Sequence, residues 1–120
     1  MEAVAQKAAR PVHVFTVPPS LSQDAGVTEV GLITLTADEE LQAFSRGKKD
    51  NAKLAIELAK AALVEVDGKQ LKLADGTVDT FWKDVDPRIR QLIMTAYAEL
   101  HGADEEDQKS FLKSRKIRVG

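Results

Sequence analysis

Few side chains in this chain of 120 residues could carry out covalent chemistry. There is no cysteine, which excludes disulfides, thiolate metal sites and a cysteine nucleophile. A hydroxyl nucleophile would need a base and a group that orients it, and the histidines are His13 and His101. We expect His13 on an edge strand and His101 at a helix end, where it caps the helix. The sequence therefore predicts a protein that is not an enzyme and has no cofactor.

Metal and phosphate sites are also not expected. Residues 104–107 are consecutive acids, whereas the ligands of a calcium loop alternate around a glycine. Acids in a row instead suit the positive N-terminal end of a helix. The glycines are scattered and form no phosphate-binding loop. We therefore predict that these acids begin a helix and bind no metal.

A basic segment follows these acids, and it could contact the phosphates of a nucleic acid. Its residues are Lys113, Arg115, Lys116 and Arg118. The net charge of the chain is −2, and aromatic residues make up only 5%, which is few for stacking on bases. The acids beside the segment would also repel a phosphate backbone. The balance argues against nucleic-acid binding and favours a solvated basic tail over residues 115–120.

The elements that would position these residues are strands near the N-terminus and helices further on. Strands are expected over 11–18 and 27–35, with a loop over 20–26 between them, and a hairpin over 64–73. Helices are expected over 36–47, 50–63, a short turn from Thr77 or Asp79, 86–101 and 105–114. This order predicts a single α+β domain in which small strands and a hairpin pack on a mainly helical C-terminal half. Residues 1–10 are expected to be a short helix or a loose arm.

Local signals support these boundaries. Thr36 and Glu39 form a capping box, Asp86-Pro87 is a strong helix start, and Asp67-Gly68 is typical of a tight hairpin turn. Leu41 and Phe44 are expected to form the short apolar face of their helix. A longer stripe at helical spacing runs through Ile89, Leu92, Ile93, Ala96, Tyr97 and Leu100.

The composition agrees with a globular domain of this size. Apolar residues are 43% and charged residues 30% of the chain, values that argue against disorder over the whole chain. No apolar run approaches the roughly 18 residues of a membrane span. We therefore expect a soluble, intracellular protein with no membrane partner.

Four segments carry a resemblance to a known family: ITLTADEEL, LVEVDGKQL, WKDVDPRIRQLIMTAYAELH and EEDQKSFLKSRKIRVG. In this order they give a strand and a Thr-Ala-Asp-Glu-Glu helix start, a Val-Asp-Gly hairpin, and a Pro-x-x-Arg-x-Leu helix with an Ala-Tyr pair. An acidic turn before Phe-Leu-x-Ser completes the order. Residues 31–120 thereby resemble the tail assembly chaperones of tailed bacteriophages, and residues 1–30 lie outside the resemblance.

The resemblance implies a non-enzymatic role in virion morphogenesis, in the host cytoplasm. Such chaperones bind the long helical tape measure protein while tail tube subunits polymerise around it, so both are expected partners. On this basis we expect an apolar binding strip, although the same spacing suits a core, in which Trp82 would dock its loop onto the long helix. The strip residues are Trp82, Ile89, Ile93 and Tyr97.

Two other functions remain open at this stage. One is a small structural protein of the phage tail, baseplate or neck, which would stay in the virion. The other is a regulatory or nucleic-acid-binding domain that uses the basic tail. Self-association into a homo-oligomer is also left open.

Overall fold

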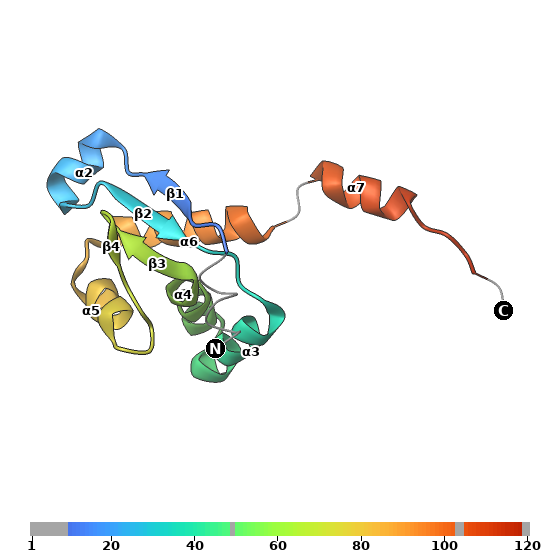
Figure 1. Cartoon of the computed structure of the whole chain (residues 1–120), viewed down its shortest axis with the longest axis horizontal. Coiled ribbons are helices and arrows are strands. Elements are labelled where there is room, and N and C mark those ends of the chain that lie inside the picture. Colours follow the sequence, from blue (N-terminus) through green and yellow to red (C-terminus); the bar gives the residue numbers. More distant parts are fainter. Residues whose placement is uncertain (1–9, 49, 103–104, 119–120) are drawn as a thin grey trace.

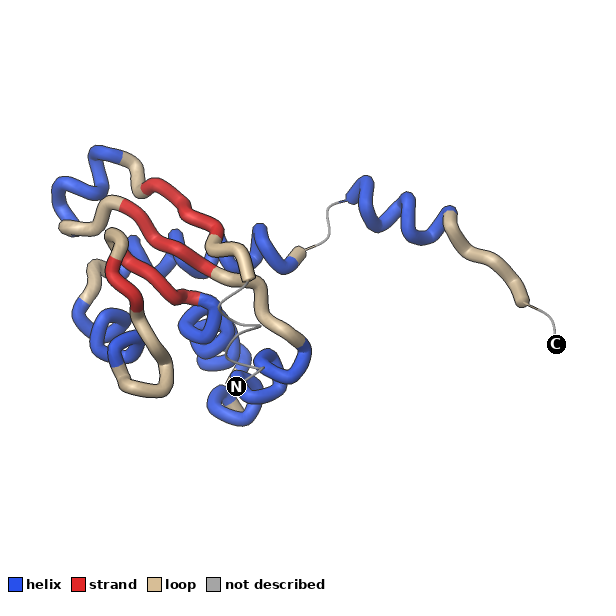
Figure 2. Tube along the Cα trace, viewed as in Figure 1, coloured by secondary structure: helices blue, strands red, loops and turns tan. Residues whose placement is uncertain are grey.

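The computed structural model describes residues 10–48, 50–102 and 105–118, and within them four strands form one antiparallel sheet in the order β1-β2-β3-β4 (Figures 1 and 2). The strands are β1 His13–Thr16, β2 Glu29–Leu32, β3 Leu63–Val66 and β4 Lys69–Gln70. The helices are α2 Pro19–Ala25, α3 Ala37–Gly47, α4 Asn51–Ala62, α5 Thr77–Asp84, α6 Pro87–His101 and α7 Glu105–Lys113. The predicted α+β fold with a helical C-terminal half is confirmed, and β1 is an edge strand as expected.

The predicted helix starts are confirmed by their hydrogen bonds. Thr36 Oγ1 accepts from the Glu39 N–H at 3.2 Å, and Glu39 Oε1 accepts from the Thr36 N–H at 2.9 Å. Asp50 caps α4 through its side chain, and Asp86 caps α6 with Pro87 in the first turn. These side chains satisfy N–H groups that a helix cannot satisfy itself.

The predicted hairpin is also confirmed, although its second strand is only two residues long. Asp67 and Gly68 have φ angles of 50° and 80°, and two consecutive positive values are what a tight two-residue hairpin turn requires. The Asp67 carboxylate has a further role, since Oδ1 accepts from the N–H groups of Thr28 and Glu29 at 2.8 and 2.9 Å. One residue therefore forms the turn and fixes the start of β2.

The loop expected over residues 20–26 is wrong, because residues 19–25 form helix α2. Pro19 stands in its first turn, and Gly26 ends it in the left-handed conformation with φ 73°. Leu21 and Ala25 are partly buried against the core. The serines and the aspartate that suggested a loop lie within this short helix, and the glycine ends it.

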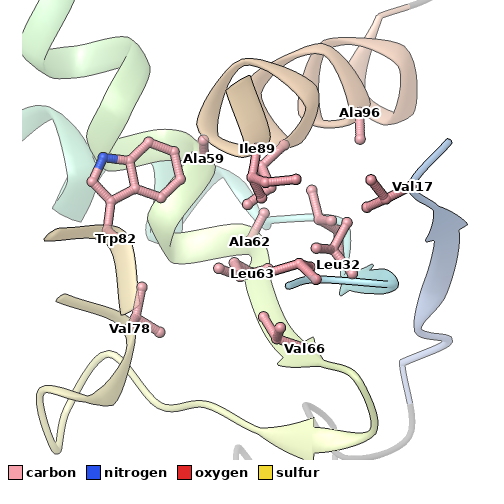
Figure 3. Close-up of a cluster of buried hydrophobic side chains, with 13 residues drawn as sticks. Val17, Leu32, Ala59, Ala62, Leu63, Val66, Val78, Trp82, Ile89 and Ala96 are labelled. Atoms are coloured by element: carbon pink, nitrogen blue, oxygen red, sulfur yellow. The ribbon is translucent and has the colours of Figure 1, made fainter. Parts of the chain in front are cut away.

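The core lies between the sheet, α4, α5 and α6 (Figure 3). From α6 it takes Ile89, Ile93 and Ala96, which repeat at helical spacing. The complete cluster is Val17, Val27, Val30, Leu32, Ala59, Ala62, Leu63, Val66, Val78, Trp82, Ile89, Ile93 and Ala96. Burial of this apolar surface is the main force that holds the layers together.

Helix α4 passes into β3 without a turn. Ala62 ends the helix and Leu63 begins the strand, and both side chains are almost completely buried. The N–H of Ile33 donates to the Ala62 carbonyl at 3.0 Å. The direction of α4 is therefore tied to that of the sheet.

Helix α3 buries a different face from the one expected. Leu41 and Phe44 are 64% and 50% exposed, while Ala43 and Gly47 are buried. A Cβ atom on Gly47 would lie 2.8 Å from the Leu54 Cα atom. The backbones of α3 and α4 are therefore in direct contact at this point. Small side chains allow this approach, and the larger ones point outward.

The two ends of the described chain differ in their contacts. Arg10 is hydrogen-bonded to the domain through the Thr34 carbonyl at 2.7 Å, and residues 1–9 of the expected arm lie outside the described residues. Helix α7 has no buried residue and stands apart from the other elements (Figure 1). Among the described residues, no helix is long and apolar enough to cross a membrane.

Gly47→Ala is expected to lower the free energy of unfolding by about 1–3 kcal/mol. The new methyl group would meet the Leu54 backbone, which cannot rotate away as a flexible side chain would. Urea unfolding measures the change. The control is Ser45→Ala, at an exposed position of the same helix, whose free energy of unfolding should stay within about 0.5 kcal/mol of the wild type. Helix propensity alone predicts that Gly47→Ala raises the free energy of unfolding. An unchanged or raised free energy of unfolding would therefore contradict the close approach of α3 to α4.

Candidate partner-binding groove

Three of the four residues of the expected binding strip lie in the core. Trp82 is 7% exposed, and Ile89 and Ile93 are not exposed at all. The sequence left a core role open for these positions, and the structure places them there (Figure 3). A partner could contact them only if the core opened.

The fourth residue, Tyr97, is partly buried and belongs to a polar cluster at the end of α6. Its hydroxyl donates to Glu40 Oε2 at 3.0 Å, and its ring stacks on His101 with centroids 4.1 Å apart. Burial, together with the hydrogen bond to Glu40, raises the pKa of Tyr97 to about 12. The cluster therefore fixes α6 against the start of α3.

His101 caps its helix as predicted and also joins two segments. Its Nε2 atom accepts from the Leu35 N–H at 2.8 Å, so Nδ1 carries the proton and donates to the Tyr97 carbonyl at 2.9 Å. His13, the other histidine, lies half-buried on β1. Both ring nitrogens of His101 are thus engaged with backbone groups.

The charged C-terminal residues lie on the surface. Glu105, Glu106 and Asp107 occupy the first turn of α7, as expected for acids at a helix start, and Asp104 lies outside the described residues. Within the part of the chain that the structure describes, no group of acidic or histidine side chains could hold a metal ion. All members of the basic segment are exposed, namely Lys113, Arg115, Lys116 and Arg118.

A groove of about 610 Å³ lies between α3, α4, α5 and the chain after β4. Its apolar lining comes from the junction of α4 with β3 and from the segment 71–74 that follows β4. Its polar lining comes from helices α3, α4 and α5 and from Lys72. The residues are Glu39, Gln42, Arg46, Glu57, Ala61, Leu63, Val64, Leu71, Lys72, Leu73, Ala74 and Asp79.

A chain of ion pairs joins the helices around this groove. Arg46 of α3 contacts Glu57 of α4 at 2.8 Å, and Lys60 of α4 contacts Glu57 at 3.3 Å and Asp79 of α5 at 2.5 Å. Burial alone would lower the pKa of Lys60, but the hydrogen bonds to Asp79 and Glu57 outweigh it and raise that pKa. The rim therefore carries both signs of charge and links α3, α4 and α5.

A second ion pair stands where Glu39 reaches the groove. The guanidinium of Arg10 binds the Glu39 carboxylate through two hydrogen bonds, at 2.6 and 3.0 Å. The Arg10 hydrogen bonds, against a smaller opposing effect of burial and with help from the Thr36 N–H, lower the pKa of Glu39 to about 2. The segment before β1 is thereby attached to the first turn of α3.

This arrangement suits binding better than catalysis. The acids of the rim are engaged by arginine and lysine side chains, which leaves them poorly placed to act as general bases. The lining is apolar and is bordered by charged side chains. It therefore fits a ligand that has apolar groups flanked by polar ones.

Comparison of the sequence with models of protein families, with curated proteins and with solved structures gave no match. The groove is therefore identified as a candidate site from its geometry alone.

Sequence reasoning missed the groove because four elements build it. One available signal was the pair Glu57 and Lys60, which lie one helical turn apart. Another was the alternation of Leu71 and Leu73, which continues past the end of β4. Neither signal indicates that α3 and α5 come to the same place.

The Arg10–Glu39 pair predicts a loss of stability in acid. Because the pKa of Glu39 falls from 4.5 to about 2 on folding, its contribution is complete above the unfolded value and is lost as pH falls toward the folded one. We expect the free energy of unfolding to decrease by about 1–2 kcal/mol more in the wild type than in Glu39→Gln across this range. Urea titrations at each pH measure the difference.

The control for this experiment is Glu99→Gln, a change at an exposed position of α6. This variant should keep the wild-type dependence on pH. If the free energy of unfolding falls with pH equally in the wild type and in Glu39→Gln, the Arg10–Glu39 pair contributes nothing to stability in solution.

Proposed function

We propose that the chain is a non-enzymatic tail assembly chaperone that binds a phage tape measure protein in the groove during tail morphogenesis. The observation that carries the proposal is the groove itself, with apolar residues between charged ones. The resemblance of residues 31–120 to these chaperones supplies the identity of the partner.

Physical chemistry supports a helical partner. An unassembled tape measure protein presents long helices with apolar stripes, which tend to aggregate in water. Apolar side chains of one stripe, spaced at i, i+3 and i+4, could enter a groove of this kind. Covering the stripe keeps the partner soluble until tube subunits displace the chaperone.

The charges around the groove fit the flanks of such a helix. Arg46 and Lys72 are positive, while Glu57 and Asp79 are negative. A helix with mixed charges beside its stripe meets opposite charges in one orientation and like charges in the reverse one. Such a rim favours a single orientation of the partner more than it adds affinity.

Ala61→Arg is expected to reduce capture of the tape measure protein by about tenfold or more, because it places a long charged side chain in the apolar lining. The measurement is co-purification of the tape measure protein encoded in the same genome, expressed together with the tagged chain. Ala74→Arg is a second groove variant at an exposed position, which guards against loss of folding. Ala52→Arg is the matched control, exposed on the opposite side of α4.

Two outcomes would contradict the proposal. One is equal capture by the groove variants and the control, with melting temperatures unchanged. The other is recovery of the chain in stoichiometric amount from purified mature virions, which would favour a structural protein of the tail, baseplate or neck.

A further inference from the structure

Helices α3 and α7 each expose a pair of large apolar side chains outside the groove. Leu41 and Phe44 on α3 are 64% and 50% exposed, and Phe111 and Leu112 on α7 are 76% and 69% exposed. Neither pair lines the groove. Each pair would gain stability if an apolar surface covered it.

The two helices repeat the same spacing around these pairs. Within a helix, intervals of three and four residues keep side chains on one face. On α3 these positions are Asp38, Leu41 and Ser45, and Lys48 follows as the C-cap with φ 53° and ψ −125°. On α7 they are Glu105, Gln108 and Leu112, and Arg115 lies two residues past the helix end at Lys113. The pattern is symmetric, so the two faces match when the helices run antiparallel.

The charges select the antiparallel arrangement. It places Asp38 opposite Arg115 and Lys48 opposite Glu105, with Leu41 opposite Leu112. A parallel arrangement would instead place Asp38 opposite Glu105, and like charges at close range repel. Both helices carry acids in the first turn and a base in the last turn, so the antiparallel pairing brings the acidic end of each helix beside the basic end of the other.

A chain cannot make this contact with its own α3. The His101 side chain is hydrogen-bonded to Leu35, so α6 ends beside the start of α3. The antiparallel pairing needs Glu105 beside Lys48, at the other end of α3, about 18 Å away along the helix axis. The four residue steps from His101 to Glu105 span at most about 14 Å.

The direction of α6 increases this distance. Tyr97 contacts Glu40 within α3, and His101, one turn later, contacts Leu35 before α3. The end of α6 therefore runs away from the C-terminal end of α3. Helix α7 stands apart from the other elements in Figure 1, and the outer face of its own α3 is out of its reach.

We propose that two copies of this chain form a dimer in which α7 of each copy packs antiparallel against the outer face of α3 of the other. The contact is reciprocal, as a two-fold symmetric dimer requires. It uses a face of α3 different from that of the groove residues Glu39, Gln42 and Arg46. The dimer therefore does not depend on the proposed function of the groove.

The experiment uses the full-length chain and two charge reversals, Asp38→Arg and Arg115→Asp. Sedimentation equilibrium at concentrations up to about 100 µM covers the affinities of small interfaces. We expect the wild type to dimerise and each single variant to self-associate at least about tenfold more weakly. Mixing the two single variants should restore dimers, because both contacts of the mixed pair then join opposite charges.

Leu112→Asp tests the apolar part of the contact, with Ser110→Asp on the opposite side of α7 as the matched control. Leu112→Asp should abolish the dimer, whereas Ser110→Asp should keep the wild-type dissociation constant within about threefold. Circular dichroism of each variant verifies that the domain is folded.

Three results would overturn the proposal: a wild type that stays monomeric over the whole range, single variants that dimerise as well as the wild type, or a mixture that stays dissociated. Tape measure capture by monomeric variants would be unaffected, since the groove is intact in them.

Discussion

The direct passage of α4 into β3 is the constraint on which the other elements depend. Ala62 and Leu63 are 0% and 1% exposed, and no turn residue stands between them to absorb a change in direction. The Ile33 N–H holds the Ala62 carbonyl, so the helix cannot rotate without breaking a contact to the strand beside it. The small side chains of Ala59 and Ala62 then let α6 lie close enough to complete the core.

The same junction determines where a partner could bind. Ala61 and Val64, on either side of it, line the groove, and the close contact of Gly47 with Leu54 brings α3 to the groove's other side. Part of the apolar lining therefore borders the buried core at the α4–β3 junction. The rim is different, because partly exposed pairs such as Lys60–Asp79 are weak and can exchange partners at small cost. The apolar lining and the charged rim are thus distinct parts of the same groove.

Local chemistry explains which elements could be predicted. The Thr36–Glu39 capping box, Asp86-Pro87 and Asp67-Gly68 each act within a few residues, and each is confirmed. Helix α2 was missed because Ser, Asp and Gly are as common in loops as at helix ends. Whether an apolar side chain is buried or exposed could not be predicted from neighbouring residues in the sequence. The spacing of Leu41 and Phe44 is as regular as that of Ile89 and Ile93, and only the packing of α3 on α4 turns the first pair outward. The groove needs four elements at once, which no single stretch of sequence reveals.

Both edge strands of the sheet, β1 and β4, are short. Its last strand, β4, is two residues long, and its first strand, β1, is flanked by Pro11 and Pro18, which have no N–H to donate to an added strand. Short or proline-flanked edges discourage the edge-to-edge growth that leads to fibrils.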